Sequence, residues 1–401
     1  MTLIYDMPET ATRKSRLPRG GINPTAALSL IEWLTGDECH ALDEASLVSG
    51  LGRRLRALGL PVDRLTLHLT TLHPEFVGRT FAWAPGEPVE IHDREHGTRL
   101  AFANTPLLKA QGMREPLIVG PGESAHGPWQ HIDIFSGRDL VQLVIAPLCN
   151  ADGPISTAVF GTRRPGGFTP VEQDVLERIL PALRNTCELH VLRQCELSLL
   201  DTYIGPMTAS RILAGHIRRG EIESMEAALL LCDLRGFTEL SNRLPGAIVL
   251  GLLNAYFDKV VPAISREGGE VLKFMGDAVL AFFPNIDAAA ACNAALNAAK
   301  TILDEADGFQ YDGIGIKVGI ALHYGEVSYG NVGSGNRLDF TLIGPDVNVV
   351  SRIQSVCSER GEALLLSDAF CQKAEITDAV SIGTHHLKGF ADPMELFTLI
   401  R

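Results

Sequence analysis

The chain has 401 residues, of which 46% are hydrophobic and 21% charged, a composition typical of a globular protein with two or three domains. Its formal net charge of −13 argues against a general binder of nucleic acids or anionic membranes, because such proteins need basic surface. We find no uninterrupted apolar run of about 18 residues and no apolar signal segment, so we expect no membrane span and a cytoplasmic location. Eight scattered cysteines without a Cys-x-x-Cys pair indicate neither a zinc site nor a disulfide framework.

The first half of the chain predicts a small domain of mixed helices and strands, at residues 23–196. The preceding residues, 1–22, are polar and lack hydrophobic periodicity, so we expect them to be disordered. The expected elements are helices from Pro24 and over 44–60, strands at Leu65–Thr71, Arg79–Trp83 and 88–93, a helix at Pro106–Gln111, strands at 139–149 and 153–162, and a long helix opened by Thr169 and Pro170. This order, with the motif GGFTPVEQD, resembles a GAF domain, a sensor module for small ligands.

The GAF resemblance implies an unknown small ligand or cofactor, with haem, a bilin and a cyclic nucleotide as alternatives to an empty domain. The side chains that such a group could use are His68, His73, His92, His96, His126, His131 and Cys149. A single histidine near a strand is more often structural than a ligand, and a cysteine at a strand end is more often packed than reactive. The sequence therefore assigns no sensor site.

The long helix continues to the Gly-Pro pair at 205–206, which is expected to end it. Near-heptad apolar positions along it are Leu176, Leu183, Leu192 and Leu199. This spacing fits a parallel two-stranded coiled coil between protomers, and in its first half it fits equally well a helix packed on its own domain. Pro181 predicts a kink or a break. Residues 197–222 are expected to form a helical linker.

The stretch 229–284 contains the residues that we expect to bind metal ions and phosphate. The continuous apolar run LLLCD predicts a buried strand, which presents Asp233 at its end. Gly236 then allows backbone N–H groups to turn toward a bound anion, and Thr238 is a suitable N-cap for the next helix. The sequence predicts a phosphate cradle beside a carboxylate.

A second carboxylate follows in the same stretch. The apolar runs VLKFM and AVLAFF flank the pair Gly276-Asp277, which predicts a β-hairpin with Asp277 at its tip. If the hairpin neighbours the first strand, Asp233 and Asp277 reach the same edge of one sheet. Two carboxylates beside a phosphate cradle suit Mg²⁺ or Mn²⁺. The alternative is that Asp277 only serves the turn and Asp233 only caps a helix.

A family resemblance rests on five motifs in this order: CDLRGFTEL, GGEVLKFMGDAVLAFF, KVGIALHYGEVSYGNVG, DFTLIGPDVNVVSRI and HLKGF. Together they make residues 223–401 resemble the catalytic domain of class III nucleotidyl cyclases. The resemblance implies a βαββαβ core of the palm-like, ferredoxin-like type, which works as a dimer with active sites at the interface. The expected fold class of the whole chain is α+β, with an α/β sensor domain first, then a helical linker and this catalytic domain.

By this resemblance, Asp233 and Asp277 bind two Mg²⁺ or Mn²⁺ ions per active site, and Leu234 adds a backbone carbonyl ligand. Phosphate oxygens would be held by the backbone amides of Arg235, Gly236, Phe237 and Thr238. The metal half of the site thus lies within the stretch 229–284.

The resemblance also implies residues that select the base and hold the rest of the nucleotide. Lys273 matches the purine-reading lysine of adenylyl cyclases, where guanylyl cyclases place glutamate. Thr341 occupies the second purine position, which is aspartate in many members of the family. Asn348 would orient the ribose, Arg352 would meet the charge that develops on the α-phosphate, and Lys388 would contact the β- and γ-phosphates.

The function implied is an adenylyl cyclase that converts ATP to 3′,5′-cyclic AMP and pyrophosphate as a homodimer. Residues 207–224 resemble the transducing segment that precedes many cyclase domains. The alternatives are a guanylyl cyclase, which Lys273 disfavours, and a nucleotide-binding signalling module without turnover. A diguanylate cyclase is excluded, because EGGEVLKF lacks the GGDEF loop.

Overall fold

The computed structural model describes residues 24–96, 105–120, 139–148, 155–284 and 287–399. The segment expected to be disordered, together with His126, His131 and Cys149, lies outside these residues. The chain divides into two compact units, 1–199 and 200–401, which are described separately.

The first unit is built on an antiparallel sheet of six strands. The strands are β1 (Arg64–Thr70), β2 (Phe76–Trp83), β3 (Glu90–Glu95), β4 (Leu117–Val119), β5 (Gln142–Leu148) and β6 (Ser156–Thr162), in the spatial order β3-β2-β1-β6-β5-β4. The helices are α1 (Pro24–Leu34), α2 (Asp37–His40), α3 (Glu44–Ala57), α4 (Pro106–Met113) and the first part of α5 (Pro170–Ile204). The predicted elements are all present, and the sequence missed the short α2 and β4.

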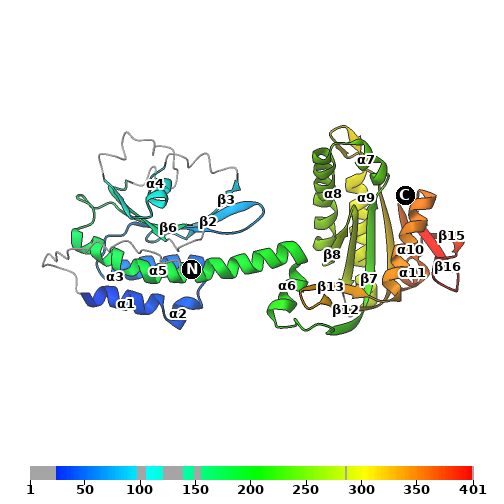
Figure 1. Ribbon diagram of the computed structural model, residues 1–401, viewed down its shortest axis with the longest axis horizontal. Coiled ribbons are helices and arrows are strands. Elements are labelled where there is room, and N and C mark those ends of the chain that lie inside the picture. Colours follow the sequence, from blue (N-terminus) through cyan, green and yellow to red (C-terminus); the bar gives the residue numbers. More distant parts are fainter. Residues whose placement is uncertain (1–23, 97–104, 121–138, 149–154, 285–286, 400–401) are drawn as a thin grey trace, which may run out of the picture. The chain divides into compact units, whose positions relative to one another are not determined.

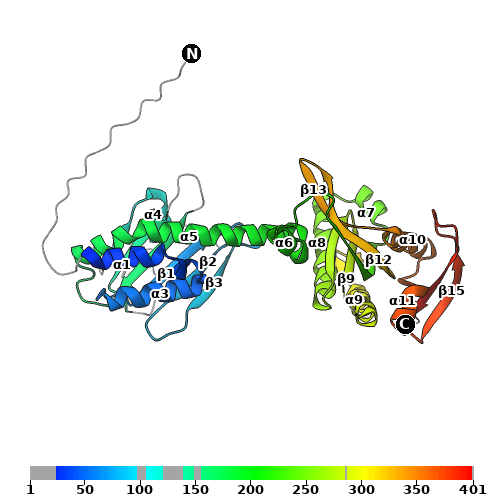
Figure 2. The same ribbon diagram turned by 90° about the horizontal axis from the view of Figure 1, so that it is seen from below.

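The core of this unit lies on one face of the sheet. Leu65, Leu67 and Leu69 alternate along β1 and pack with the apolar sides of α1, α3 and α5. Figures 1 and 2 show these three helices on the same side of the sheet, with α4 on the other. The second face therefore receives the intervening polar residues of β1, whose partners are described below.

Helix α5 begins where the sequence predicts. The Thr169 hydroxyl accepts from the Glu172 N–H at 3.3 Å, and the Glu172 carboxylate accepts from the Thr169 N–H at 2.7 Å, which is a capping box. The helix runs to Ile204 without interruption at Pro181, so the predicted break does not occur. Gly205, at φ 84°, ends it as predicted.

The apolar positions of α5 have two different environments. Leu176 and Leu183 are buried in the core of the first unit, as expected for a helix packed on its own domain. Leu192 and Leu199 are exposed, at 57% and 37% of their full accessible area. Only the second half of α5 therefore presents an uncovered apolar seam.

The second unit contains an eight-stranded mixed sheet. Its strands are β7 (Ile222–Leu234), β8 (Glu270–Met275), β9 (Ala278–Pro284), β12 (Val318–Ser334), β13 (Arg337–Ile343), β14 (Leu364–Ser367), β15 (Ala379–His385) and β16 (Met394–Leu399), and β10 (Gln310–Tyr311) pairs separately with β11 (Ile314–Gly315). Its helices are α6 (Pro206–Leu213), α7 (Phe237–Arg243), α8 (Gly246–Arg266), α9 (Ala288–Ala306), α10 (Pro345–Arg360) and α11 (Asp368–Lys373).

The central part of this sheet has the predicted connectivity. The chain runs β7–α8–β8–β9–α9–β12, a βαββαβ unit, and the strands lie in the order β12-β7-β9-β8. β13 pairs with the far end of β12, and β14 pairs with its beginning. β7 lies between β12 and β9, which explains why its apolar run is continuous.

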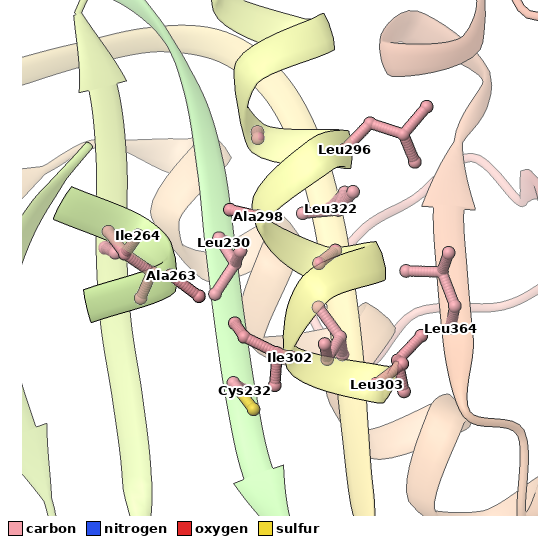
Figure 3. Packing of buried hydrophobic residues seen from close by; sticks show 14 of the residues in the cluster. Leu230, Cys232, Ala263, Ile264, Leu296, Ala298, Ile302, Leu303, Leu322 and Leu364 are labelled. Carbon is pink, nitrogen blue, oxygen red and sulfur yellow. The ribbon is translucent and has the colours of Figure 1, made fainter. Parts of the chain in front are cut away.

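Residues 227–232 of β7 are all buried, and they divide between two cores. Leu230 and Cys232 pack against α8 and α9, whereas Leu229 and Leu231 pack against α10 on the other face. Figure 3 shows Ala298 and Ile302 of α9 lying against Leu230 and Cys232. The strand that carries Asp233 is thus fixed on both faces.

Helix α8 is long and apolar enough to cross a membrane by length and composition. One side of it is nevertheless buried in this domain, through Leu252, Tyr256, Val260, Ala263 and Ile264. Helix α8 is therefore a packed helix of the second unit.

Candidate active site

The two predicted aspartates meet at the end of β7. Asp233 is the penultimate residue of β7, and Asp277 lies in the two-residue turn between the paired residues Met275 and Ala278. The Asp277 carboxyl group hydrogen-bonds to that of Asp233 and accepts from the backbone N–H of Leu234. Burial first, and then Asp233, raise the pKa of Asp277 from 3.8 to about 7. Two carboxyl groups in contact at the end of a strand form a ready site for a cation.

The segment after β7 differs from the prediction at two residues. Helix α7 begins at Phe237 with Gly236 as its N-cap in the left-handed region, at φ 71°, so Thr238 is not the N-cap. The Arg235 N–H donates to the Lys317 carbonyl oxygen at 2.8 Å, so this amide is already used and does not face a phosphate. The amides of Gly236, Phe237 and Thr238 remain candidates, because the first N–H groups of a helix have no acceptor within it.

The Arg235 side chain has a structural role that the sequence did not indicate. Its guanidinium group donates to the carbonyl oxygen of Cys357, at 2.9 Å, and to that of Glu362. A Cβ on Gly319 would lie 2.0 Å from Arg235 Nη2, so the lack of a side chain at Gly319 makes room for the guanidinium group. Arg235 thereby ties the end of β7 to the C-terminal end of α10.

Lys273 lies on β8 and pairs with a residue of β13. Its Nζ is 3.2 Å from Asp339 Oδ2. Thr341 is two residues beyond Asp339 on the same strand, so both side chains point to the same face of β13. The structure therefore brings Lys273 to the face that carries Thr341. Asp339 was missed, although its place two residues before Thr341 in DFTLIG was a signal.

Asn348 and Arg352 lie on α10, as predicted, one helical turn apart. Asn348 is exposed, and among the described residues its amide group reaches the Gly344 carbonyl oxygen alone, at 3.5 Å, the limit of a hydrogen bond. Arg352 is half-buried. Both side chains are thus carried by a rigid element and are available to a ligand.

A buried polar network positions the start of α10, and sequence reasoning missed it. Asp346 Oδ1 is 3.0 Å from His323 Nε2, His323 Nδ1 is 2.8 Å from Ser367 Oγ, and Asp346 Oδ2 accepts from the Glu326 N–H at 2.8 Å. The hydrogen bond to His323 lowers the pKa of Asp346 below its usual value. A Cβ on Gly325 would lie 2.3 Å from the Asp346 carboxyl group. The network fixes the turn that precedes Asn348.

Lys388 lies in the segment between β15 and β16 and is exposed. Its neighbour Leu387 is buried in the core beneath α10, at 3% exposure. The segment is thus anchored by one residue while the next, Lys388, faces solvent.

The carboxyl pair and the β13 residues lie toward opposite ends of β12. Asp233 is opposite Gly319, whereas Thr341 is opposite Gly330. Eleven residues of β12 separate these two positions, so the two groups of side chains belong to different levels of the strand. Lys273 is four residues from Asp277 in sequence, but its ammonium group pairs with Asp339 on β13. Within one chain, the carboxyl pair of Asp233 and Asp277 therefore lies apart from Lys273, Asp339 and Thr341, here called the β13 set.

Residues 222–400 match the family model described as the adenylate and guanylate cyclase catalytic domain. These residues are a class III cyclase catalytic domain. The match confirms the resemblance for the second half of the chain, and it identifies no family for the first half.

The cyclase domain has named relatives. It is similar to an adenylate cyclase of Anabaena cylindrica, with 30% identity over 172 residues, 42% of this chain and 34% of that one. The photoactivated adenylate cyclase subunit alpha of Euglena gracilis is 28% identical over 331 residues, 77% of this chain and 31% of that one. The solved adenylyl cyclase CyaB from P. aeruginosa is 26% identical and covers 45% of this chain and 96% of that one, with a TM-score of 0.40. The chain spans about a third of the length of these two curated relatives.

Proposed function

We propose that the protein is an adenylyl cyclase, which converts ATP to 3′,5′-cyclic AMP and pyrophosphate in the cytoplasm. The observation that carries the proposal is the contact between Asp233 and Asp277 at the end of β7, within a cyclase domain. The named relatives, which are adenylate cyclases, support the choice of ATP.

The carboxyl pair fits the divalent ions that the family implies. Asp277 is held partly protonated near neutral pH by burial and by its neighbour, so exchange of that proton for Mg²⁺ or Mn²⁺ would relieve the repulsion between the two carboxylates. Both groups offer hard oxygen ligands, which these ions prefer, and the Leu234 carbonyl is a further candidate. When bound, two such ions would lower the pKa of the ribose 3′-hydroxyl and neutralise the polyphosphate.

Base selection would rest on Lys273 and Thr341. An ammonium group can donate to N1 of adenine, whereas guanine presents a donor at that edge. The ion pair with Asp339 supports this role, because it limits the directions that the Lys273 side chain can take. The Thr341 hydroxyl can accept from the adenine amino group, but a hydroxyl also donates, so it discriminates less than a carboxylate.

The remaining residues would hold the reacting groups in line. Asn348 would orient the ribose so that its 3′-oxygen faces the α-phosphorus, and Arg352 would stabilise the charge that develops on the α-phosphate. Lys388 and the α7 amides of Gly236, Phe237 and Thr238 would hold the β- and γ-phosphates that leave as pyrophosphate. The network from His323 to Asp346 would support this arrangement by fixing the turn before α10.

We further propose that the active protein is a homodimer with two shared sites. The separation of the carboxyl pair from the β13 set supports this, because the partner could bring its own β13 set to the carboxyl pair. The exposed Leu192 and Leu199 of α5 offer a seam for a parallel pair of helices. The first unit would act as a GAF-like sensor that regulates the dimer.

The product assay tests the proposal. The purified full-length protein is incubated with ATP or GTP, with Mn²⁺ or Mg²⁺, and the cyclic products are separated by chromatography and quantified. We expect cyclic AMP and pyrophosphate in equal amounts, loss of both in Asp277→Asn, and much less product from GTP. Cyclic GMP as the main product would instead support the guanylyl cyclase alternative. Tight nucleotide binding without any product would support the signalling module without turnover.

A further inference from the structure

The face of β1 that is turned away from the helices of the first unit is polar and buried. Arg64, Thr66 and His68 alternate with the core leucines of this strand, so their side chains share one face. They are 2%, 0% and 2% exposed. Charged and polar side chains are rarely buried this deeply unless they are paired.

Only part of the hydrogen-bonding capacity of these residues is used. Arg64 Nη2 donates to Glu90 Oε2 at 2.6 Å, and His68 Nδ1 lies 2.9 Å from Thr80 Oγ1. Within the described part of the chain, Arg64 Nε and Nη1, Thr66 Oγ1 and His68 Nε2 are buried without a hydrogen-bond partner. Such groups are uncommon in native proteins, because each costs its full desolvation free energy.

A second guanidinium group reaches the same face from β3. Arg94 Nη2 donates to the Leu69 carbonyl oxygen at 3.1 Å, while its Nε, among the described residues, is also buried without a partner. A Cβ on Gly78 would lie 2.3 Å from Arg94 Nη2, so glycine at this position makes room for the arginine. Burial, and then the charge of Arg94, lower the pKa of His68 to about 3. His68 is therefore neutral, and Arg94 is close enough to act on it.

The chemistry of the face identifies the kind of ligand it suits. Arg64 is paired with Glu90, whereas Arg94 has no acidic partner among the described residues, which leaves one positive charge to be balanced at Arg94. The unpartnered atoms of the two arginines are all donors, and Thr66 and His68 can donate as well. Guanidinium groups do not ligate metal ions, so the face suits an anion with oxygen acceptors. A phosphate group, with up to two negative charges at neutral pH, would leave a buried charge unbalanced.

We propose that this face of the first unit is a binding site for a small organic monocarboxylate, whose carboxylate group is held by Arg94 and accepts hydrogen bonds from Thr66 and His68. The proposal rests on the first unit alone and does not depend on the cyclase activity.

The test uses thermal unfolding of the full-length protein with acetate, butyrate or benzoate as sodium salts. Sodium chloride at equal ionic strength, the three corresponding amides and inorganic phosphate serve as comparisons. We expect at least one carboxylate to raise the unfolding temperature of the first unit, and its amide not to do so, because only the carboxylate supplies the missing charge. The proposal is overturned if none of the carboxylates stabilises the protein, if the amides are equally effective, or if phosphate is more effective.

Substitutions then locate the effect. Arg94→Gln should weaken the stabilising carboxylate by at least about tenfold, since a hydrogen bond from a charged donor is lost. Arg79→Gln is the matched control: Arg79 is also an arginine of this sheet, but it pairs with Asp93 at 2.5 Å and lies on the opposite side of β2 from Thr80. Equal weakening in both variants would contradict the assignment.

Thr66→Val distinguishes a ligand site from a purely structural polar cluster, and it is the variant least prone to misfold. Replacing an unpaired buried hydroxyl with a methyl group should leave the unfolding temperature of the ligand-free protein unchanged or higher, while weakening carboxylate binding. A lower unfolding temperature without ligand would mean that an internal water molecule already pairs the hydroxyl. That result would overturn the proposal.

Discussion

Replacing Lys273 by glutamate should damage the use of ATP far more than it damages the fold. The side chain of Lys273 is 30% exposed and that of its partner Asp339 is 67% exposed, so their ion pair contributes less than about 1 kcal/mol to stability. In the proposed complex, however, Lys273→Glu removes the donor to the purine and leaves the adenine acceptor unpaired. This costs about 1–3 kcal/mol, or about 5- to 150-fold in kcat/KM for ATP.

The assay compares kcat/KM for ATP and the urea midpoint of unfolding in wild type, Lys273→Glu and Lys300→Glu. Lys300 is an exposed lysine of α9, so this control makes the same charge change on a different element of the same unit. We expect a loss of kcat/KM only in Lys273→Glu, with all three midpoints close together. If kcat/KM for ATP stays within about twofold of wild type, Lys273 does not contact the purine.

Three further predictions concern the elements around the site. Arg235→Ala should lower the free energy of unfolding by about 2–4 kcal/mol, because two carbonyl oxygens at the end of α10 lose their donor. A loss below about 0.5 kcal/mol would contradict the role of Arg235 in tying β7 to α10. Gly205→Ala should lower the urea midpoint of unfolding more than Gly215→Ala does. Both glycines have a positive φ, but only a Cβ at position 205 would meet Glu270 Oε1, at 2.4 Å. Equal losses in the two variants would show that this clash does not matter. Burial raises the pKa of Glu270 above its usual 4.5, so the folded state favours the neutral acid. The stability that Glu270 contributes is therefore complete below pH 4.5 and is lost as the pH rises through the raised pKa. The urea midpoint of wild type should therefore fall relative to that of Glu270→Gln as the pH rises above about 4.5, and a difference that does not vary with pH would contradict this reading.

The sequence predicted those features that depend on neighbouring residues. The apolar run before Asp233, the two-residue turn at Asp277 and the helix start at Thr169 are local patterns, and each was found where it was expected. The N-cap was assigned wrongly to Thr238, because Gly236 adopts a left-handed conformation and caps α7 two residues earlier. The N-cap propensity of threonine did not reveal this backbone conformation of Gly236.

The features that the sequence did not predict depend on contacts between distant parts of the chain. Arg235 belongs to the predicted phosphate cradle, yet the partners of its side chain lie more than a hundred residues away, on and after α10. Asp339 meets Lys273 only because the β12–β13 hairpin approaches β8. The polar face around Arg64 and His68 requires the pairing of β1 with β2 and β6, which spacing in the sequence does not indicate.

Subunit complementation tests the central claim, that each cyclase site is completed by two chains. Asp233→Ala should abolish activity by removing a metal ligand, and Arg352→Ala should reduce it by about 10²–10³-fold. When the two proteins are mixed and exchange subunits, half of the dimers are heterodimers, each with one site that carries both defects and one that carries neither. Recovery should therefore approach about a quarter of the wild-type activity.

The matched control is a mixture of Asp233→Ala and Asp277→Ala, which should stay inactive because both changes lie in the same half of the site. Subunit exchange is followed in parallel with labelled chains. Recovery to about a quarter in the first mixture, and none in the second, is the predicted result. If exchange is complete and neither mixture recovers activity, each chain builds its site alone and the shared-site account is wrong.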